Sequence, residues 1–286
     1  MRFIVGSTPE GTRTYMVKGE AAKMVSHSAT DILSLIQSGD SVSLNYDALT
    51  SAEVSVDSIV PALPVDQPPK TICLGLNYAD HIKEGGYAVP EYPALFMRSR
   101  RSLVPAGAPI VRPTCSERLD YEVELMLIIG KGGRHIKQED ALDHVFGYTV
   151  FNDGSVRDYQ RKTHQWTPGK NFDDTGAIGP FVVTPDELPA GAVGLKIESR
   201  VGDEILQSAS TSDMLWSVAR AISIISEYTT LEEGDYIAMG TPPGVGHAKT
   251  PPRWLVPGET VEVEVEGIGI LANPIVDEAD YKKDAA

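Results

Sequence analysis

Most apolar segments of this 286-residue chain are as short as β-strands, and this pattern constrains the fold most strongly. Helical periodicity is clear in one segment, which starts near Ser212 and ends before Gly234. Many strands with few helices indicate a β-rich α+β fold. We predict strands over residues 71–76, 119–129, 145–151, 179–183, 195–201, 235–239, 260–265 and 269–271.

The first 64 residues carry two short strand-like runs, one amphipathic stretch and no chemical motif. In the amphipathic stretch, Thr30 is a suitable N-cap for a short helix that Gly39 ends. Residues 60–69 are rich in proline and are interpreted as an extended linker. We therefore predict a small N-terminal domain over residues 1–64 and a larger catalytic domain over residues 65–286.

Charge and composition restrict the possible partners. The chain has 25 lysines and arginines against 40 acidic residues, a net charge of −15, which argues against nucleic acid or an anionic membrane as partner. The basic cluster at residues 98–101 is interpreted as a solvated loop. With no membrane-length apolar run and no signal-peptide pattern, we expect a soluble cytoplasmic protein.

We predict that Cys73 and Cys115, which lack C-x-x-C spacing, are buried reduced thiols. We also predict that the tail from Asp277 is frayed.

Two glutamates stand two residues apart in an apolar strand, and an aspartate closes the next apolar run. Strand residues alternate between faces, so Glu122 and Glu124 point to one side while Val123 and Leu125 point to the other. Two carboxylates on a mostly buried strand repel each other and lose hydration, and a divalent cation relieves both costs. Together with Asp153 the pattern indicates a metal site, with a solvated face of ordinary surface charges as the alternative.

Five short motifs follow one another along the chain: N-Y-x-x-H-x-x-E from Asn77, E-x-E from Glu122, D-x-S-x-R-D-x-Q from Asp153, G-K-x-F-D from Gly169, and G-T-P-P-G-V-G from Gly240. In this order they resemble the fumarylacetoacetate hydrolase family, over about residues 70–276. The resemblance implies a mixed β-sandwich roll and a homodimer. Many relatives have serine where this chain has Asn171, a departure that leaves the choice of substrate open.

The resemblance implies that Glu122, Glu124 and Asp153 bind one Mg²⁺ or Mn²⁺. Three carboxylates without a thiolate or an imidazole suit such an ion better than zinc. The resemblance also implies that Lys170 is a catalytic cation that stabilises a developing oxyanion. The alternative for Lys170 is an ordinary lysine in a solvent-exposed loop.

His81 and Glu84 are three residues apart, which places both on one face of a helical turn. The resemblance implies that this pair activates water, with the carboxylate orienting the imidazole. The alternative is an incidental pair on a surface helix. Because Gly85 and Gly86 follow, we interpret the segment as a lid that orders over bound substrate. No role is assigned to the remaining histidines, which are His27, His135, His144, His164 and His247.

Three further residues are implied to contact the substrate. Arg157 and Gln160 stand one helical turn apart after Asp153, and the resemblance assigns Gln160 to the substrate, whereas an arginine in such a position is often structural. The loop from Gly240 lacks the ending of a phosphate-binding loop, and its prolines remove backbone donors. We therefore expect Thr241 to bind a substrate carboxylate.

The function that the resemblance implies is hydrolysis of a carbon–carbon bond in a 2,4-dioxo acid. Fumarylpyruvate or maleylpyruvate, from bacterial catabolism of aromatic compounds, would give pyruvate and a second carboxylic acid. The alternatives within enzymes are an oxaloacetate decarboxylase and an isomerase of the hydroxymuconate type. Outside enzymes, a binding protein that has lost activity is the alternative, and the complete set of motif residues counts against it.

Overall fold

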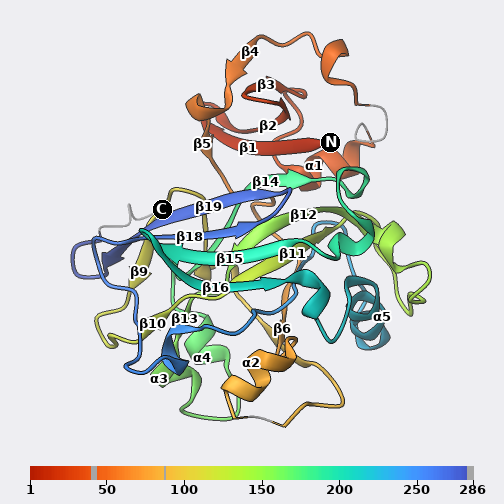
Figure 1. Cartoon of the computed structure of the whole chain (residues 1–286). Coiled ribbons are helices and arrows are strands. Elements are labelled where there is room, and N and C mark those ends of the chain that lie inside the picture. Colours follow the sequence, from red (N-terminus) through yellow and green to blue (C-terminus); the bar gives the residue numbers. More distant parts are fainter. Residues whose placement is uncertain (40–43, 87, 282–286) are drawn as a thin grey trace.

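The computed structural model describes residues 1–39, 44–86 and 88–281. In these ranges the chain forms a large mixed sheet of twelve strands and a second sheet of five strands, with few helices (Figure 1). The predicted β-rich α+β fold is confirmed. The order of the large sheet is β4-β3-β2-β1-β14-β12-β11-β17-β6-β7, with β5 paired to β1 and β8 to β14. The second sheet has the order β16-β15-β18-β19-β9, and β10 pairs with β13 in a separate two-stranded ladder.

The strands of the large sheet are β1 (Arg2–Thr8), β2 (Gly11–Lys18), β3 (Ala21–Met24), β4 (Glu53–Ser55), β5 (Val60–Pro61), β6 (Thr71–Gly75), β7 (Ala94–Met97), β8 (Leu103–Pro105), β11 (Val123–Ile129), β12 (Val145–Asn152), β14 (Gly176–Val183) and β17 (Tyr236–Ala238). The other strands are β9 (Ile110–Arg112), β10 (Leu119–Asp120), β13 (Ser155–Val156), β15 (Lys196–Val201), β16 (Glu204–Ser210), β18 (Thr260–Val265) and β19 (Gly269–Asp277). The α-helices are α1 (Ile32–Ser38), α2 (Ala79–Glu84), α3 (Arg157–Gln160), α4 (Thr167–Lys170) and α5 (Val218–Tyr228).

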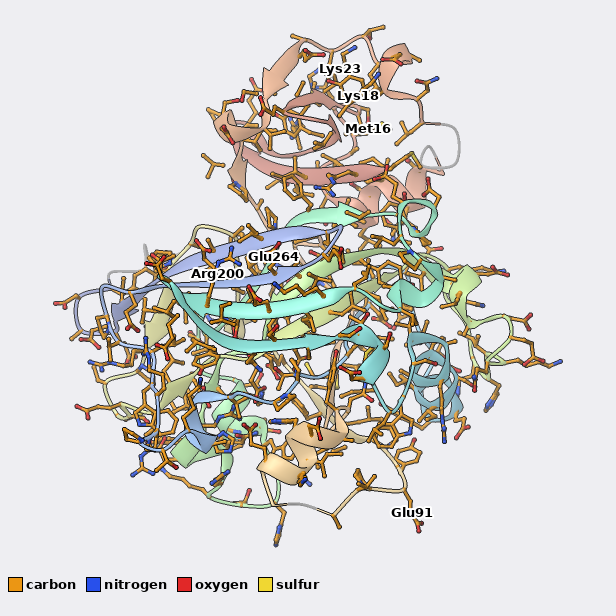
Figure 2. All side chains as sticks on the ribbon, viewed as in Figure 1. Met16, Lys18, Lys23, Glu91, Arg200 and Glu264 are labelled. Atoms are coloured by element: carbon orange, nitrogen blue, oxygen red, sulfur yellow. The ribbon has the colours of Figure 1, made fainter. Side chains whose placement is uncertain are left out.

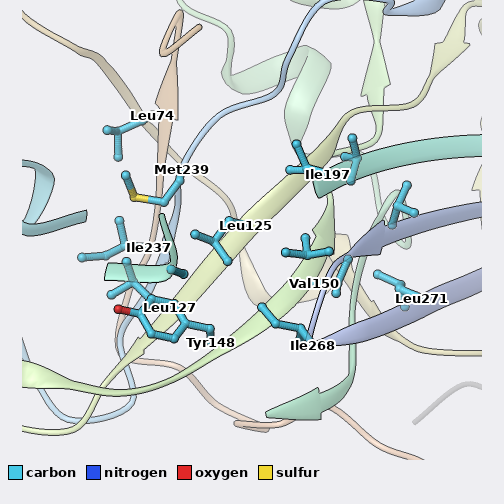
Figure 3. Close-up of a cluster of buried hydrophobic side chains, with 14 of the residues drawn as sticks. Leu74, Leu125, Leu127, Tyr148, Val150, Ile197, Ile237, Met239, Ile268 and Leu271 are labelled. Atoms are coloured by element: carbon cyan, nitrogen blue, oxygen red, sulfur yellow. The ribbon is translucent and has the colours of Figure 1, made fainter. Parts of the chain in front are cut away.

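Strand β11 lies inside the large sheet and is buried on both faces, which explains its nearly continuous apolar sequence. On one face, Leu125 and Leu127 pack with residues of the second sheet in the main core (Figure 3). On the other face, Met126 and Ile128 pack in a second core, to which the N-terminal segment contributes residues such as Phe3. Glu122 and Glu124 share the face of Met126, so the sheet directs them to the same side of the strand.

Because β11 is packed inside the main core, we expect a large loss of stability when one of its buried side chains is shortened. Leu127 is 0 % exposed, and Leu127→Ala should lower the free energy of unfolding by about 3 kcal/mol, because it leaves a cavity between two sheets. Ile270→Ala is the matched control, because Ile270 on β19 is 43 % exposed and should cost less than about 1 kcal/mol. Urea unfolding followed by circular dichroism measures both, and equal losses would contradict this view of the core.

The N-terminal residues add strands to the large sheet, because β1 pairs antiparallel with β14. Helix α1 begins one residue later than predicted, since Asp31 rather than Thr30 is the N-cap: its carboxylate accepts from the backbone N–H of Ser34 at 2.8 Å. Gly39 ends the helix in a left-handed conformation, as predicted. The boundary between the two predicted domains stays a prediction.

Three expectations need correction. The helix predicted from Ser212 begins only at Val218, because the backbone N–H of Trp216 donates to the Asn77 side chain at 2.7 Å and so holds the preceding residues outside the helix. Cys73 is buried, but Cys115 is exposed in a turn after β9. The tail does not fray from Asp277, since the N–H of Tyr281 bonds the Asp277 carbonyl at 3.0 Å, while residues 282–286 lie outside the described ranges.

In the described ranges, no helix is both long enough and apolar enough to span a membrane.

Candidate active site

A small cavity that is partly open to solvent lies where several distant segments of the chain meet. Its walls come from β6, α2, β11, the segment after β12, α3, α4 and the loop after β17. Helices α2, α3 and α4 gather at one end of the molecule, below the sheets in Figure 1. The cavity therefore joins all five sequence motifs in one place.

Glu122, Glu124 and Asp153 come together at this cavity, and all three are buried. Each offers a carboxylate oxygen, and these oxygens lie within 4.8 Å of one another. The sheet fixes the arrangement, because the backbone N–H of Asp153 donates to the Glu122 carbonyl at 2.9 Å, where β11 begins beside the end of β12. The solvated-face alternative is thus wrong for these glutamates.

Lys170 lies against two of the three carboxylates. Its ammonium donates to Asp153 at 2.5 Å and also to Glu122. The side chain is only 2 % exposed, so the alternative of a solvent-exposed lysine is wrong. Burial raises the pKa of Glu122, but the charges of Arg157 and Lys170 outweigh burial and hold this pKa well below its usual range.

Glu124 is the acid of the triad that lacks a cationic partner among the described residues. Its carboxylate accepts the backbone N–H of Gly240 at 2.9 Å. Burial, together with the negative charges of Asp153 and Glu122, raises the pKa of Glu124 well above its usual range. A divalent cation would offset this excess of negative charge, and a set of oxygen donors suits Mg²⁺ or Mn²⁺. The residues present therefore fit a hard divalent ion.

The prediction that residues 98–101 form a solvated basic loop is wrong for Arg98. Arg98 is 3 % exposed, and its guanidinium donates to the carboxylate of Asp153. It also donates to the hydroxyls of Ser102 at 3.1 Å and Thr175 at 2.8 Å. Gly176 makes room for it, because a Cβ there would lie 2.8 Å from the guanidinium. Arg98 therefore holds the Asp153 carboxylate in place, a contact that sequence reasoning missed.

Arg157 is held by three partners. Its Nε donates to Asp120 at 2.7 Å, one terminal nitrogen donates to the Gln160 amide oxygen at 2.9 Å, and the other lies 2.6 Å from Glu122. Gln160 lines the cavity, and its amide nitrogen remains available as a donor. Burial raises the pKa of Asp120, but the charge of Arg157 and hydrogen bonds from His247 and Arg157 lower it below its usual value.

The His81–Glu84 pair lies on α2 as predicted. The Nδ1 of His81 is 3.4 Å from the Glu84 carboxylate, which also accepts the backbone N–H of Gly244 at 3.0 Å. The imidazole is 11 % exposed and lines the cavity, so the alternative of an incidental surface pair is wrong for His81. Because Nδ1 faces Glu84, Nε2 is the ring nitrogen left to act as a base.

Thr241 also lines the cavity. Its hydroxyl oxygen accepts from Gln207 at 2.8 Å, which leaves the hydroxyl hydrogen free to donate to a ligand. Gln207 and His247 are further site residues that sequence reasoning missed. His247 was assigned no role, yet its Nδ1 lies 3.4 Å from Asp120. Asp120 itself precedes Glu122 by two residues, so the strand alternation was a signal for it.

Comparisons with known proteins match most of this chain. Residues 70–276 match the family model described as fumarylacetoacetate (FAA) hydrolase C-terminal. The mitochondrial oxaloacetate tautomerase of Xenopus laevis is 37 % identical over 272 residues, which are 94 % of this chain and 80 % of that protein. Two solved structures resemble the whole chain and confirm the fold type expected from the motifs.

The first of these structures is the fumarylacetoacetate hydrolase of Exiguobacterium antarcticum, with a TM-score of 0.87 and 35 % identity, covering 97 % of this chain and 100 % of that one. The second is the 2-hydroxyhepta-2,4-diene-1,7-dioate isomerase of Mycobacterium marinum, with a TM-score of 0.79 and 28 % identity, covering 98 % and 100 %.

Proposed function

This chain belongs to the fumarylacetoacetate hydrolase family, and from that premise we propose that it is a divalent-metal-dependent enzyme that tautomerises oxaloacetate. One observation carries the proposal: a buried triad of carboxylates and an oriented imidazole line the same small cavity. Glu122, Glu124 and Asp153 would hold Mg²⁺ or Mn²⁺. When bound, the ion supplies Lewis-acid polarisation of the keto group and makes the C3 proton more acidic.

The chain's own residues move the proton and hold the substrate. His81, oriented by Glu84, takes a proton from C3 at Nε2 and returns it to the oxygen on C2, which converts the keto form to the enol without any other reactant. The ammonium of Lys170 stabilises negative charge at the C2 oxygen. The Thr241 hydroxyl and the Gln160 amide donate to the substrate carboxylate.

Hydrolysis of an acylpyruvate such as fumarylpyruvate or maleylpyruvate is the second candidate, and the His81–Glu84 pair favours it. There His81 would take a proton from water, and the resulting hydroxide attacks the carbonyl at C4. The C3–C4 bond breaks, its electron pair goes to C3, and protonation of C3 gives pyruvate beside the free acid. A decarboxylase or an isomerase of the hydroxymuconate type would need no such water.

A substitution of His81 tests these roles. His81→Ala should lower kcat by about a hundredfold or more on oxaloacetate enolisation and on acylpyruvate cleavage, because a positioned base contributes this much. Mn²⁺ binding should persist, since His81 is not a ligand. Glu84→Gln should act in the same direction by removing the charge that orients the imidazole.

The two reactions are assayed in parallel, with enol, pyruvate and CO₂ measured separately. Loss of activity on fumarylpyruvate alone would assign the base to hydrolysis. An unchanged kcat on both substrates would refute the assigned role of His81. The decarboxylase would be favoured if the wild type only released CO₂ and if His81→Ala left that activity unchanged.

As the family resemblance suggests, we also propose that the protein is a homodimer.

A further inference from the structure

Three arginine or lysine side chains line the cavity, and they differ in their partners. Lys170 and Arg157 are buried and are held by acidic residues of the site. Arg161 follows α3 directly and is exposed. Within residues 1–39, 44–86 and 88–281, its guanidinium makes no hydrogen bond or ion pair. The cavity therefore has one cation whose donors remain available.

Acidic residues outnumber basic ones by 40 to 25 in this chain, so an available cation at the cavity is a local departure from its negative net charge. A guanidinium at the mouth of a cavity attracts anions and can bind a carboxylate through two parallel hydrogen bonds. The carboxylate adjacent to the keto group of a 2-oxo acid belongs near the metal triad and Thr241. Arg161 is thus available for a different anionic group of the same molecule.

His247 lies on the same cavity and is fixed in place by Asp120. The Asp120 carboxylate accepts the backbone N–H groups of Gly246 at 2.8 Å and His247 at 3.0 Å, and it also binds Arg157 of α3. One buried acid therefore ties the His247 segment to the helix that leads into Arg161. Because Nδ1 of His247 faces Asp120, Nε2 is the ring nitrogen left for a ligand.

We propose that Arg161 and His247 form a subsite for the second carboxylate of the substrate, which makes the enzyme selective for 2-oxo dicarboxylic acids. The substrate class rests on the proposed function. The geometry of the subsite does not. It follows from a guanidinium with no partner among the described residues and from a histidine on the same cavity whose backbone N–H bonds Asp120. Oxaloacetate and fumarylpyruvate both carry the required second carboxylate, so the subsite serves either candidate reaction.

Binding of two matched ligands tests the subsite without turnover. 2-Oxoglutarate and 2-oxopentanoate have the same carbon chain and differ only in the second carboxylate. Calorimetric titration of the Mg²⁺-loaded full-length protein should show at least about tenfold tighter binding of 2-oxoglutarate, the usual effect of a charge-assisted hydrogen bond. Arg161→Gln should reduce this preference to less than about threefold, chiefly because it weakens the binding of 2-oxoglutarate. Arg161→Lys should retain part of the preference. His247→Gln should reduce the preference as well.

Arg220→Gln is the matched control, because Arg220 is an exposed arginine on α5 and does not line the cavity. This variant should keep the wild-type preference. Two results would refute the proposed subsite. The first is equal affinity of the wild type for 2-oxoglutarate and 2-oxopentanoate, and the second is an equal loss of affinity for both ligands in Arg161→Gln. A protein that keeps the predicted preferences but does not turn over oxaloacetate would refute the proposed reaction and leave the subsite standing.

Discussion

Glu124→Gln should abolish turnover and weaken Mn²⁺ binding by more than about a hundredfold, while the metal-free protein stays folded. Loss of a residue that only supports a metal ligand already costs ten- to a hundredfold in affinity, so loss of a ligand should cost more. The metal-free protein should not lose stability, because Glu124 is buried near the negative charges of Asp153 and Glu122. Calorimetry with Mn²⁺ and urea unfolding of the metal-free protein measure the two effects.

Glu264→Gln is the control for this substitution. Glu264 lies on β18 and pairs with Arg200 at 2.7 Å on the partly exposed surface of the second sheet (Figure 2). It does not line the cavity that contains the metal triad. Its replacement should change neither Mn²⁺ affinity nor turnover. Full activity of Glu124→Gln in the presence of metal would show that Glu124 is not a ligand.

Arg98→Met should lower the free energy of unfolding by about 3–5 kcal/mol, because it leaves the buried carboxylate of Asp153 without one of its two cationic partners. Arg101→Met, from the same basic cluster, should cost less than about 0.5 kcal/mol. Arg101 is 71 % exposed, and its ion pair with Asp173 is screened by solvent.

Urea unfolding of both metal-free variants makes this comparison. Mn²⁺ should restore part of the stability of Arg98→Met, because a cation bound beside Asp153 replaces some of the missing positive charge. Equal losses for the two variants would contradict the buried position of Arg98.

The metal triad was predictable because its geometry is local. Alternation along one strand places Glu122 and Glu124 on the same face, and the pairing of two consecutive strands brings Asp153 beside them. The motif order then identified the family, and the comparisons support it. The helical turn that joins His81 to Glu84 is equally local.

The missed features depend on contacts between distant segments. Arg98 stands in a polar, basic stretch that gives no local sign of burial, and its partners Asp153 and Thr175 are 55 and 77 residues away. The start of α5 was misplaced because Asn77, far upstream, binds the backbone of Trp216. Sequence periodicity carries no information about such partners.

The central claim is that a metal bound by this triad allows His81 to enolise a 2-oxo acid. The most direct test follows the ultraviolet absorbance of the enol form of oxaloacetate in the presence of the protein. The account predicts rapid approach to keto–enol equilibrium with Mg²⁺, loss of this acceleration with EDTA, recovery on adding Mg²⁺ or Mn²⁺ back, and no acceleration by Glu124→Gln under any of these conditions. An undiminished rate in metal-free protein, or no acceleration by the Mg²⁺-loaded wild type, would contradict it.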